Sequence, residues 1–234
     1  MLRKKLSIII LITLFLTLNC VPQDDQYTKT RDEMVSEQIE NRGITNQATL
    51  NSMRKVLRHK FVPPNLVERA YNDSPLPIGY GQTISQPYIV AYMTAVINPK
   101  PKQKILEVGT GSGYQAAVLS EIVEEIYTIE IITELYNSSN KRLKELGYKN
   151  VFCKNSDGYH GWKEFAPFDA IVVTAAAEYI PPPLIEQLKD GGKMIIPVGS
   201  PFLNQTLILV EKYGEEITTT SLLPVRFVPF TREN

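Results

Sequence analysis

Residues 104–115 read KILEVGTGSGYQ, a short apolar run followed by three glycines at every second position, Gly109, Gly111 and Gly113. The apolar run predicts a buried strand, and the small and apolar residues from Ala116 to Leu119 predict a helix. Glycine permits positive φ angles and lets a ligand approach the backbone, while free N–H groups at a helix start attract an anionic or polar group. We therefore expect a turn that binds a nucleotide-like cofactor. The alternative is a tight turn with no ligand.

The composition suits one α/β domain with extensions. The chain has 234 residues, of which 43% are hydrophobic, with 25 basic and 25 acidic side chains. A zero formal net charge gives no general field to hold nucleic acid, so no nucleic-acid partner is expected. The two cysteines and two histidines do not lie at metal-ligand spacing, so no metal site is expected.

Residues 1–20 differ in character from the rest of the chain. Arg3, Lys4 and Lys5 precede an uncharged apolar run from Leu6 to Leu18, and Cys20 follows. The run is short for a membrane span and has the charged start and apolar middle of a secretory signal. Cys20 favours a lipidated leader, although Asn19 before it is not the usual small residue. We expect membrane association through this leader and exclude it from the fold.

Residues 27–86 are expected to form a helical cap and an active-site loop. Helical periodicity from Tyr27 to Val56 predicts two helices, the first ended by Gly43 and the second capped by Thr45. From Asn72 to Gln86 the frequent glycine and proline predict a loop.

This loop ends in the sequence QTISQP, residues 82–87. Pro87 suits the first position of a helix, so Thr83 and Ser85 are expected just outside a helix N-terminus. The spacing leaves two interpretations of Ser85 open, a helix cap and a functional side chain.

Residues 87–234 are expected to form the core. Strands alternate with helices through most of this part of the chain, which predicts a doubly wound, mostly parallel α/β sheet. After the strand at 104–108, the further parallel strands are expected at 126–129, 151–153, 168–173 and 194–198. The tail predicts antiparallel strands at 206–212, 217–222 and 225–228.

Acidic side chains follow three of these strands. In an open parallel sheet, ligands bind at the carboxyl ends of the strands, where Glu107, Glu130 and Asp157 are expected. Glu130 comes 17 positions after Gly113, where an acid can accept hydrogen bonds from ribose hydroxyls. A surface carboxylate at a helix start is its alternative. Asp157 and Gly158 either face an adenine amino group or form a plain turn.

An acid before G-x-G-x-G, a second acid after the next strand and a third after the one beyond it form the layout of an S-adenosylmethionine pocket. With these motifs, the chain resembles the protein-L-isoaspartate (D-aspartate) O-methyltransferase family, which has a Rossmann-like methyltransferase fold. The Thr83-Ile84-Ser85 segment is particular to this family, whereas the glycine loop is shared by many methyltransferases. The matching stretches run from Met34 to Thr231 and include 42–44, 82–87, 106–115, 157–158, 167–169, 175–177, 197–199 and 226–229.

The resemblance implies roles for particular residues. Ser85 matches the family's active-site serine, and Thr83 is expected to act with it on the substrate. The expected cofactor contacts are Gln82, Ile84, Glu107, Gly109, Gly111, Gly113, Glu130, Asp157, Gly158 and Thr231.

The resemblance also implies the reaction, which is methyl transfer from S-adenosylmethionine to the α-carboxylate of isoaspartyl and D-aspartyl residues in damaged proteins. It implies a monomeric, cytoplasmic enzyme, whereas the leader favours a membrane-anchored or periplasmic one. Two rival functions remain. A nicotinamide-dependent oxidoreductase is disfavoured because Tyr114 stands where the dinucleotide motif has its third glycine. An exported lipoprotein that kept the fold as a binding module is the other.

Overall fold

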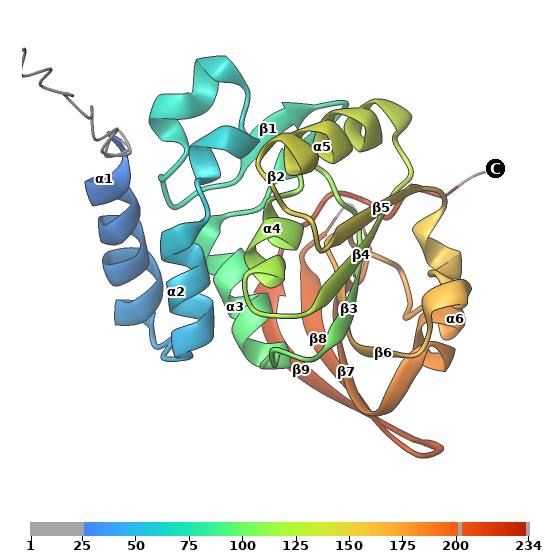
Figure 1. Cartoon of the computed structure of the whole chain (residues 1–234). Coiled ribbons are helices and arrows are strands. Elements are labelled where there is room, and N and C mark those ends of the chain that lie inside the picture. The colour runs from blue at the N-terminus through green and yellow to red at the C-terminus, as the bar shows by residue number, and fades with distance from the viewer. Residues whose placement is uncertain (1–25, 201–202, 233–234) are drawn as a thin grey trace, which may run out of the picture.

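The computed structural model describes residues 26–200 and 203–232, and a seven-stranded sheet forms its centre (Figure 1). In chain order the strands are β3 Lys104–Val108, β4 Glu125–Glu130, β5 Val151–Asn155, β6 Phe168–Val173, β7 Leu188–Val198, β8 Gln205–Tyr213 and β9 Glu216–Val225. Their order across the sheet is β5-β4-β3-β6-β7-β8-β9. The first five strands run parallel to one another, and β8 pairs antiparallel with both β7 and β9. The prediction of a mostly parallel sheet with an antiparallel C-terminal end is confirmed.

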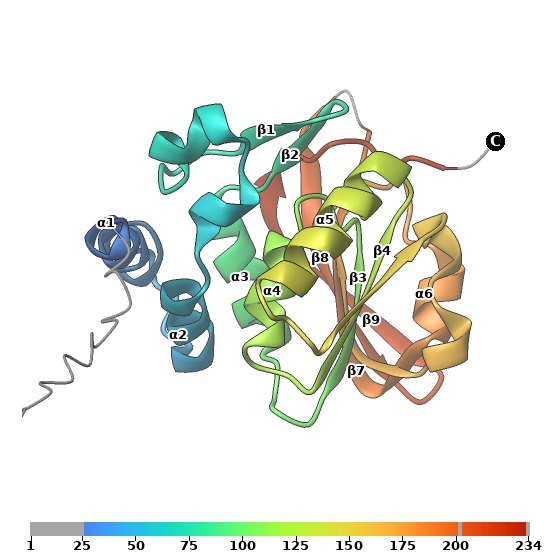
Figure 2. The same cartoon turned by 45° about the horizontal axis from the view of Figure 1, so that its top comes forward.

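Helices cover both faces of the sheet. The α-helices of the core are α3 Pro87–Ile97, α4 Tyr114–Ser120, α5 Thr133–Glu145 and α6 Pro182–Glu186. Alternate residues of the buried strands point to opposite faces. Ile105 packs with side chains of α3 and α4, whereas Leu106 packs with Leu184 of α6. Figures 1 and 2 show α6 on the opposite side of the sheet from α3 and α4.

The N-terminal cap packs against α3 and α4 (Figure 2). It consists of α1 Thr28–Glu33, a π-helical segment Met34–Ile39, α2 Gln47–Lys55 and 3₁₀ turns at Glu40–Arg42, Arg58–Phe61 and Pro64–Arg69. Buried cap residues such as Met53 share one apolar cluster with Tyr114 and Ala117 of α4. The cap and the sheet domain therefore share a continuous core.

The strand order reverses beside β3. The chain passes from β3 to β4 and β5 on one side, and then returns to place β6 on the other side of β3. Adjacent connections that run in opposite directions leave a crevice at the carboxyl ends of the strands. This topology places the glycine loop after β3 at the crevice.

The structure corrects four local predictions. The loop expected from Asn72 to Gln86 contains an antiparallel hairpin, β1 Leu76–Gly79 and β2 Gln82–Ile84. Strand β7 begins at Leu188, ahead of the expected start at Met194. In the tail, β9 continues to Val225, and the expected strand at 225–228 is instead an extended segment with one bridge between Pro229 and Ala176. Periodicity missed these features because strand formation depends on the partner strand, which the pattern of one segment does not reveal.

The fourth correction concerns the cap of α2. Gly43 ends the preceding 3₁₀ turn in a left-handed conformation, as expected. The N-cap, however, is Asn46 rather than Thr45, and its side-chain oxygen accepts the backbone N–H of Thr49 at 2.9 Å. Asparagine and threonine are both good N-caps, so composition could not distinguish the two adjacent positions.

No helix within residues 26–200 and 203–232 is long and apolar enough to cross a membrane. The predicted leader, residues 1–20 with Cys20, lies outside the described residues.

The Asn46 cap generates a stability prediction. Asn46→Ala should lower the free energy of unfolding by about 1 kcal/mol and the Tm by roughly 2–4 °C, because the Thr49 N–H loses its acceptor. Thermal unfolding measures the change. Asn46→Ser, which keeps an acceptor oxygen, and Thr45→Ala should both stay close to the parent protein. Equal losses for the alanine variants at positions 45 and 46 would contradict the assignment.

Candidate active site

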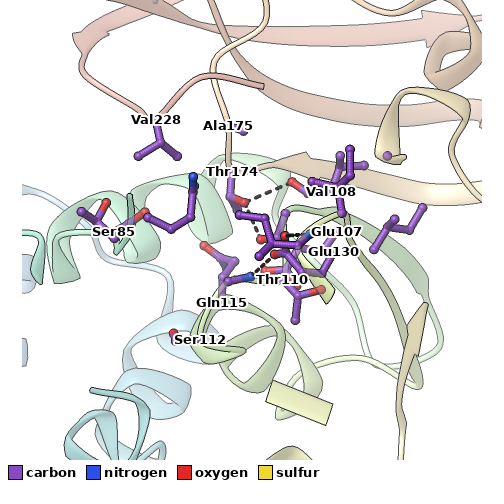
Figure 3. A pocket seen from close by; sticks show the side chains of 18 of the residues that line it. Ser85, Glu107, Val108, Thr110, Ser112, Gln115, Glu130, Thr174, Ala175 and Val228 are labelled. Carbon is purple, nitrogen blue, oxygen red and sulfur yellow. Dashed lines mark hydrogen bonds between the residues drawn. The ribbon is translucent and has the colours of Figure 1, made fainter. Parts of the chain in front are cut away.

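A cavity lies at the carboxyl ends of β3 and β4, in the crevice at the strand-order reversal (Figure 3). Its floor is the glycine loop, and its walls come from the end of β4, the loop after β6, the β2 hairpin strand and the C-terminal segment 228–231. Figure 3 shows Ser85 at one side of the cavity and Glu107 and Glu130 at the other. Gly158, after β5, and Val90 of α3 complete the lining, so parts of the chain that are distant in sequence meet at one site.

Most of the residues expected to form the site line this cavity. They are Gln82, Thr83, Ile84, Ser85, Glu107, Gly109, Gly111, Glu130, Gly158 and Thr231. Gly113 and Asp157 are not among the lining residues. A Cβ on Gly113 would lie 3.1 Å from Leu143 Cδ1, so this glycine permits close packing of α5 against the loop.

Glu107 is a buried carboxyl group with an unfilled hydrogen-bonding position. It is 0% exposed, and Oε2 accepts the hydroxyl of Thr128, which in turn accepts the hydroxyl of Thr110 at 2.6 Å. Oε1 has no hydrogen-bond partner among the described residues. Burial raises the pKa of Glu107 to about 8. An acceptor oxygen buried at the cavity suits a ligand that brings a donor or a positive charge, as the amino acid part of S-adenosylmethionine does.

Glu130 holds the glycine loop to the end of β4. Its Oε2 accepts the backbone N–H of Gly111 at 2.7 Å, and its Oε1 accepts that of Ile132 at 2.9 Å. Burial raises its pKa, and these two backbone bonds act in the opposite direction. The residue is 5% exposed, so a surface carboxylate at a helix start does not describe it. Each oxygen keeps a lone pair for a ligand hydroxyl.

The turn requires glycine at its first position. Gly109 has a φ angle of +101°, and a Cβ there would lie 2.3 Å from Thr174 Oγ1. The Thr174 hydroxyl donates to the carbonyl of Gly109 at 2.6 Å and so ties the loop after β6 to the loop after β3. Thr174 lines the cavity but was not predicted, although its position directly after a buried strand is a signal that could have identified it.

Ser85 does not cap α3. The N-cap of that helix is Gln86, and no side chain caps its N-terminus. Ser85 is instead half-buried in the wall of the cavity. Together with Thr83, it also lines a second cavity, whose other side includes Asn204, Arg226 and Phe227. These two residues therefore border both cavities.

The C-terminal segment closes the cavity on the side of Gly158. Phe230 N donates to the carbonyl of Ala176 at 2.9 Å, and Arg232 Nε donates to Asp157 Oδ2 at 2.7 Å. The Arg232 guanidinium also lies 3.6 Å from the ring centroid of Tyr159. Asp157 is 3% exposed and anchors this tail. Nothing in the sequence indicated a contact between residues 75 positions apart.

The strand order and this arrangement of acids and glycines at the sheet edge define a Rossmann-like methyltransferase that uses S-adenosylmethionine. The model of one family, described as protein-L-isoaspartate (D-aspartate) O-methyltransferase, matches residues 29–234. The chain belongs to this family, as its motifs predicted.

Curated relatives of that description cover nearly the whole chain. A protein-L-isoaspartate O-methyltransferase of Opitutus terrae is 52% identical over 231 residues, which span 99% of each chain. One from Syntrophobacter fumaroxidans is 54% identical and covers 89% of this chain and 88% of its own. Neither rival function receives support from these relatives.

One similar solved structure holds S-adenosyl-L-homocysteine, the form of the cofactor that remains after methyl transfer. A crystal structure from Plasmodium falciparum, described as a protein-L-isoaspartate O-methyltransferase in complex with S-adenosyl-L-homocysteine, has a TM-score of 0.76 and 27% identity. The similarity covers 87% of this chain and 99% of that one.

The buried Glu107 generates a prediction on pH. Its pKa is raised from 4.5 to about 8, so the folded protein binds more protons than the unfolded chain between these values and its stability falls as pH rises through them. Glu107→Gln has no such titration. The free energy of unfolding of the ligand-free parent, relative to this variant, should therefore decrease between about pH 5 and 8. Urea denaturation at several pH values measures it.

Glu145→Gln is the matched control, since Glu145 lies in an exposed helical ion pair with Lys141. The pH dependence of its stability should stay parallel to that of the parent. A parallel curve for Glu107→Gln as well would show that Glu107 is ionised in the folded protein at neutral pH.

Proposed function

We propose that this protein transfers a methyl group from S-adenosylmethionine to the α-carboxylate of isoaspartyl and D-aspartyl residues in damaged proteins and thereby initiates their repair. The observation that carries the proposal is the position of the Gln82–Pro87 loop. It sets Ser85 and Thr83 between the cofactor cavity and a second cavity. Membership of the family and the names of its relatives support the same reaction.

The cofactor half of the site is assigned to the sheet edge. Glu130 would accept hydrogen bonds from the ribose hydroxyls through the lone pairs left by Gly111 and Ile132. Glu107 Oε1 would accept from the amino group of the cofactor, whose positive charge favours the ionised carboxylate. Gly158 and Thr231 would enclose the adenine side.

The substrate half is assigned to the second cavity. Arg226 is exposed at its edge, and Thr83 and Ser85 line both this cavity and the cofactor cavity. An isoaspartyl residue that enters there would bring its α-carboxylate to these hydroxyls, which orient it by donating hydrogen bonds.

When bound, S-adenosylmethionine supplies a methyl group on a sulfonium, and transfer forms a carbon–oxygen bond to the carboxylate as the carbon–sulfur bond breaks. A carboxylate is ionised at neutral pH, so the chain needs no general base. Its residues contribute by positioning, for which effective molarities of roughly 10⁵–10⁸ M are known in well-oriented systems. Ser85 and Thr83 orient the substrate and are not nucleophiles.

Monomeric state and cytoplasmic location remain predictions from the family resemblance. The alternative of membrane attachment depends on residues 1–20, and cell fractionation with a test for lipid on Cys20 would decide between them.

The defining test is substrate choice. The purified full chain, with cofactor labelled in the methyl group, should methylate an isoaspartyl peptide and leave the aspartyl peptide of the same sequence unlabelled. Equal labelling of both peptides, or of neither while the cofactor binds, would refute the proposed function.

The substrate half and the cofactor half of the site are each tested by one variant. Ser85→Ala should lower turnover by about tenfold or more, since one oriented hydrogen bond to a charged group is lost, while the Kd for S-adenosylhomocysteine stays unchanged. Glu130→Ala should instead weaken that Kd by about tenfold or more. Calorimetry and initial rates measure the two effects. Unchanged turnover would remove Ser85 from the site, and an unchanged Kd would remove Glu130.

A further inference from the structure

Arg58 is a buried cation directly behind the substrate loop. It begins the 3₁₀ turn Arg58–Phe61 and is 0% exposed. Its Nη2 donates to the carbonyl of Ser85 at 2.7 Å, and its Nε donates to the carbonyl of Ala70 at 2.7 Å. The side chain does not line the cavity, so any effect on the reaction is exerted through Ser85 or through its charge.

Within residues 26–200 and 203–232, no carboxylate forms an ion pair with Arg58. Its Nη1 has no hydrogen-bond partner there. Burial lowers its pKa to about 10, which leaves it charged at neutral pH. The ionisable groups that face it are the phenols of Tyr71 and Tyr114, and the Tyr71 hydroxyl contacts His59 Nδ1 at 2.8 Å.

Such an arrangement is costly for folding. Removing a charge from water without a counter-ion is unfavourable, and a ring face compensates for only part of this. Here the guanidinium carbon lies 4.8 Å from the ring centroid of Tyr114. Tyr114 is the first residue of α4, directly after the glycine loop. Arg58 therefore contacts both the substrate loop and the helix that begins at the cofactor loop.

We propose that Arg58 is a positioning residue for the methyl transfer, whose charge is balanced by the substrate. It fixes the backbone of Ser85 against the cap, and the α-carboxylate held at the Ser85 hydroxyl supplies a counter-ion that the described residues do not provide. This inference rests on the proposed function.

The positive charge of Arg58 should act in opposite directions on the two ligands of the reaction. A buried cation attracts the anionic substrate and repels the cationic S-adenosylmethionine, but has no net effect of this kind on the sulfur of S-adenosylhomocysteine. Arg58→Met removes the charge and keeps much of the volume. This variant should raise the KM for the isoaspartyl peptide by about tenfold. It should also lower the ratio of the Kd for S-adenosylmethionine to the Kd for S-adenosylhomocysteine by about threefold.

A structural role alone predicts a different result. If Arg58 only held the loops together, Arg58→Met would weaken the binding of S-adenosylmethionine and of S-adenosylhomocysteine equally. The ratio of their Kd values would then stay unchanged. Arg54→Met is the matched control, because Arg54 lies on the same cap and makes a partly exposed ion pair with Glu40 at 2.9 Å. It should change neither KM nor the ratio.

Arg58→Lys provides a second test if the methionine variant does not fold. A buried lysine loses its proton at a much lower pH than arginine. The KM of Arg58→Lys for the isoaspartyl peptide should therefore rise by about tenfold between about pH 7 and 10, relative to the parent protein at each pH. The parent protein contains the same neighbouring titratable groups, namely His59, Tyr71, Tyr114 and Glu107. Their effect on KM therefore cancels when the variant is compared with the parent at the same pH.

The outcomes are separable. If Arg58→Met leaves the ratio of the two Kd values unchanged, the proposal is overturned. If that variant does not fold, the proposal is overturned when the KM of Arg58→Lys equals that of the parent at every pH. Failure of the proposed function shows itself differently, as a parent protein that does not methylate the isoaspartyl peptide. The ratio of cofactor affinities still tests the charge of Arg58 in that case.

Discussion

The hydrogen bonds from the backbone of Gly111 and Ile132 to the carboxylate of Glu130 connect the two strand ends on which the site depends. Because β3 and β4 are parallel neighbours, their carboxyl ends lie at the same edge of the sheet. The carboxylate of Glu130 accepts the N–H of Gly111 and so holds the glycine loop at this edge. The same carboxylate is the proposed ribose ligand, so in the proposed function one group both shapes the loop and binds the cofactor.

Three charged or titratable side chains are buried around the site without full compensation, namely Glu107, Glu130 and Arg58. A fold selected for stability alone would gain by replacing such groups with apolar ones of similar size. In the proposed function, their partners are a cationic cofactor and an anionic substrate residue. Buried groups with shifted pKa values are typical of functional sites, and these three lie at or beside the cavity.

Much of the core followed from local pattern. The parallel strands were predicted because strands buried on both faces are continuous apolar runs, and the glycine turn was predicted from its register. The hairpin at Leu76–Ile84 was missed because its turn residues Gly79, Tyr80 and Gly81 also suit an open loop. The alternatives for Ser85 and Glu130 could not be separated by spacing, since a cap, a surface acid and a ligand contact have the same neighbours in sequence.

By itself the sequence determined the fold class, the family and most of the residues that line the cavity, because periodicity and short motifs are local properties of the chain. Only the tertiary structure decided how these residues are held. It brought Arg58 against Ser85, Thr174 against Gly109 and Arg232 against Asp157, across 27, 65 and 75 positions of the chain. Such contacts arise when loops from separate strand ends meet at one sheet edge, and no local pattern encodes which side chains will face each other there.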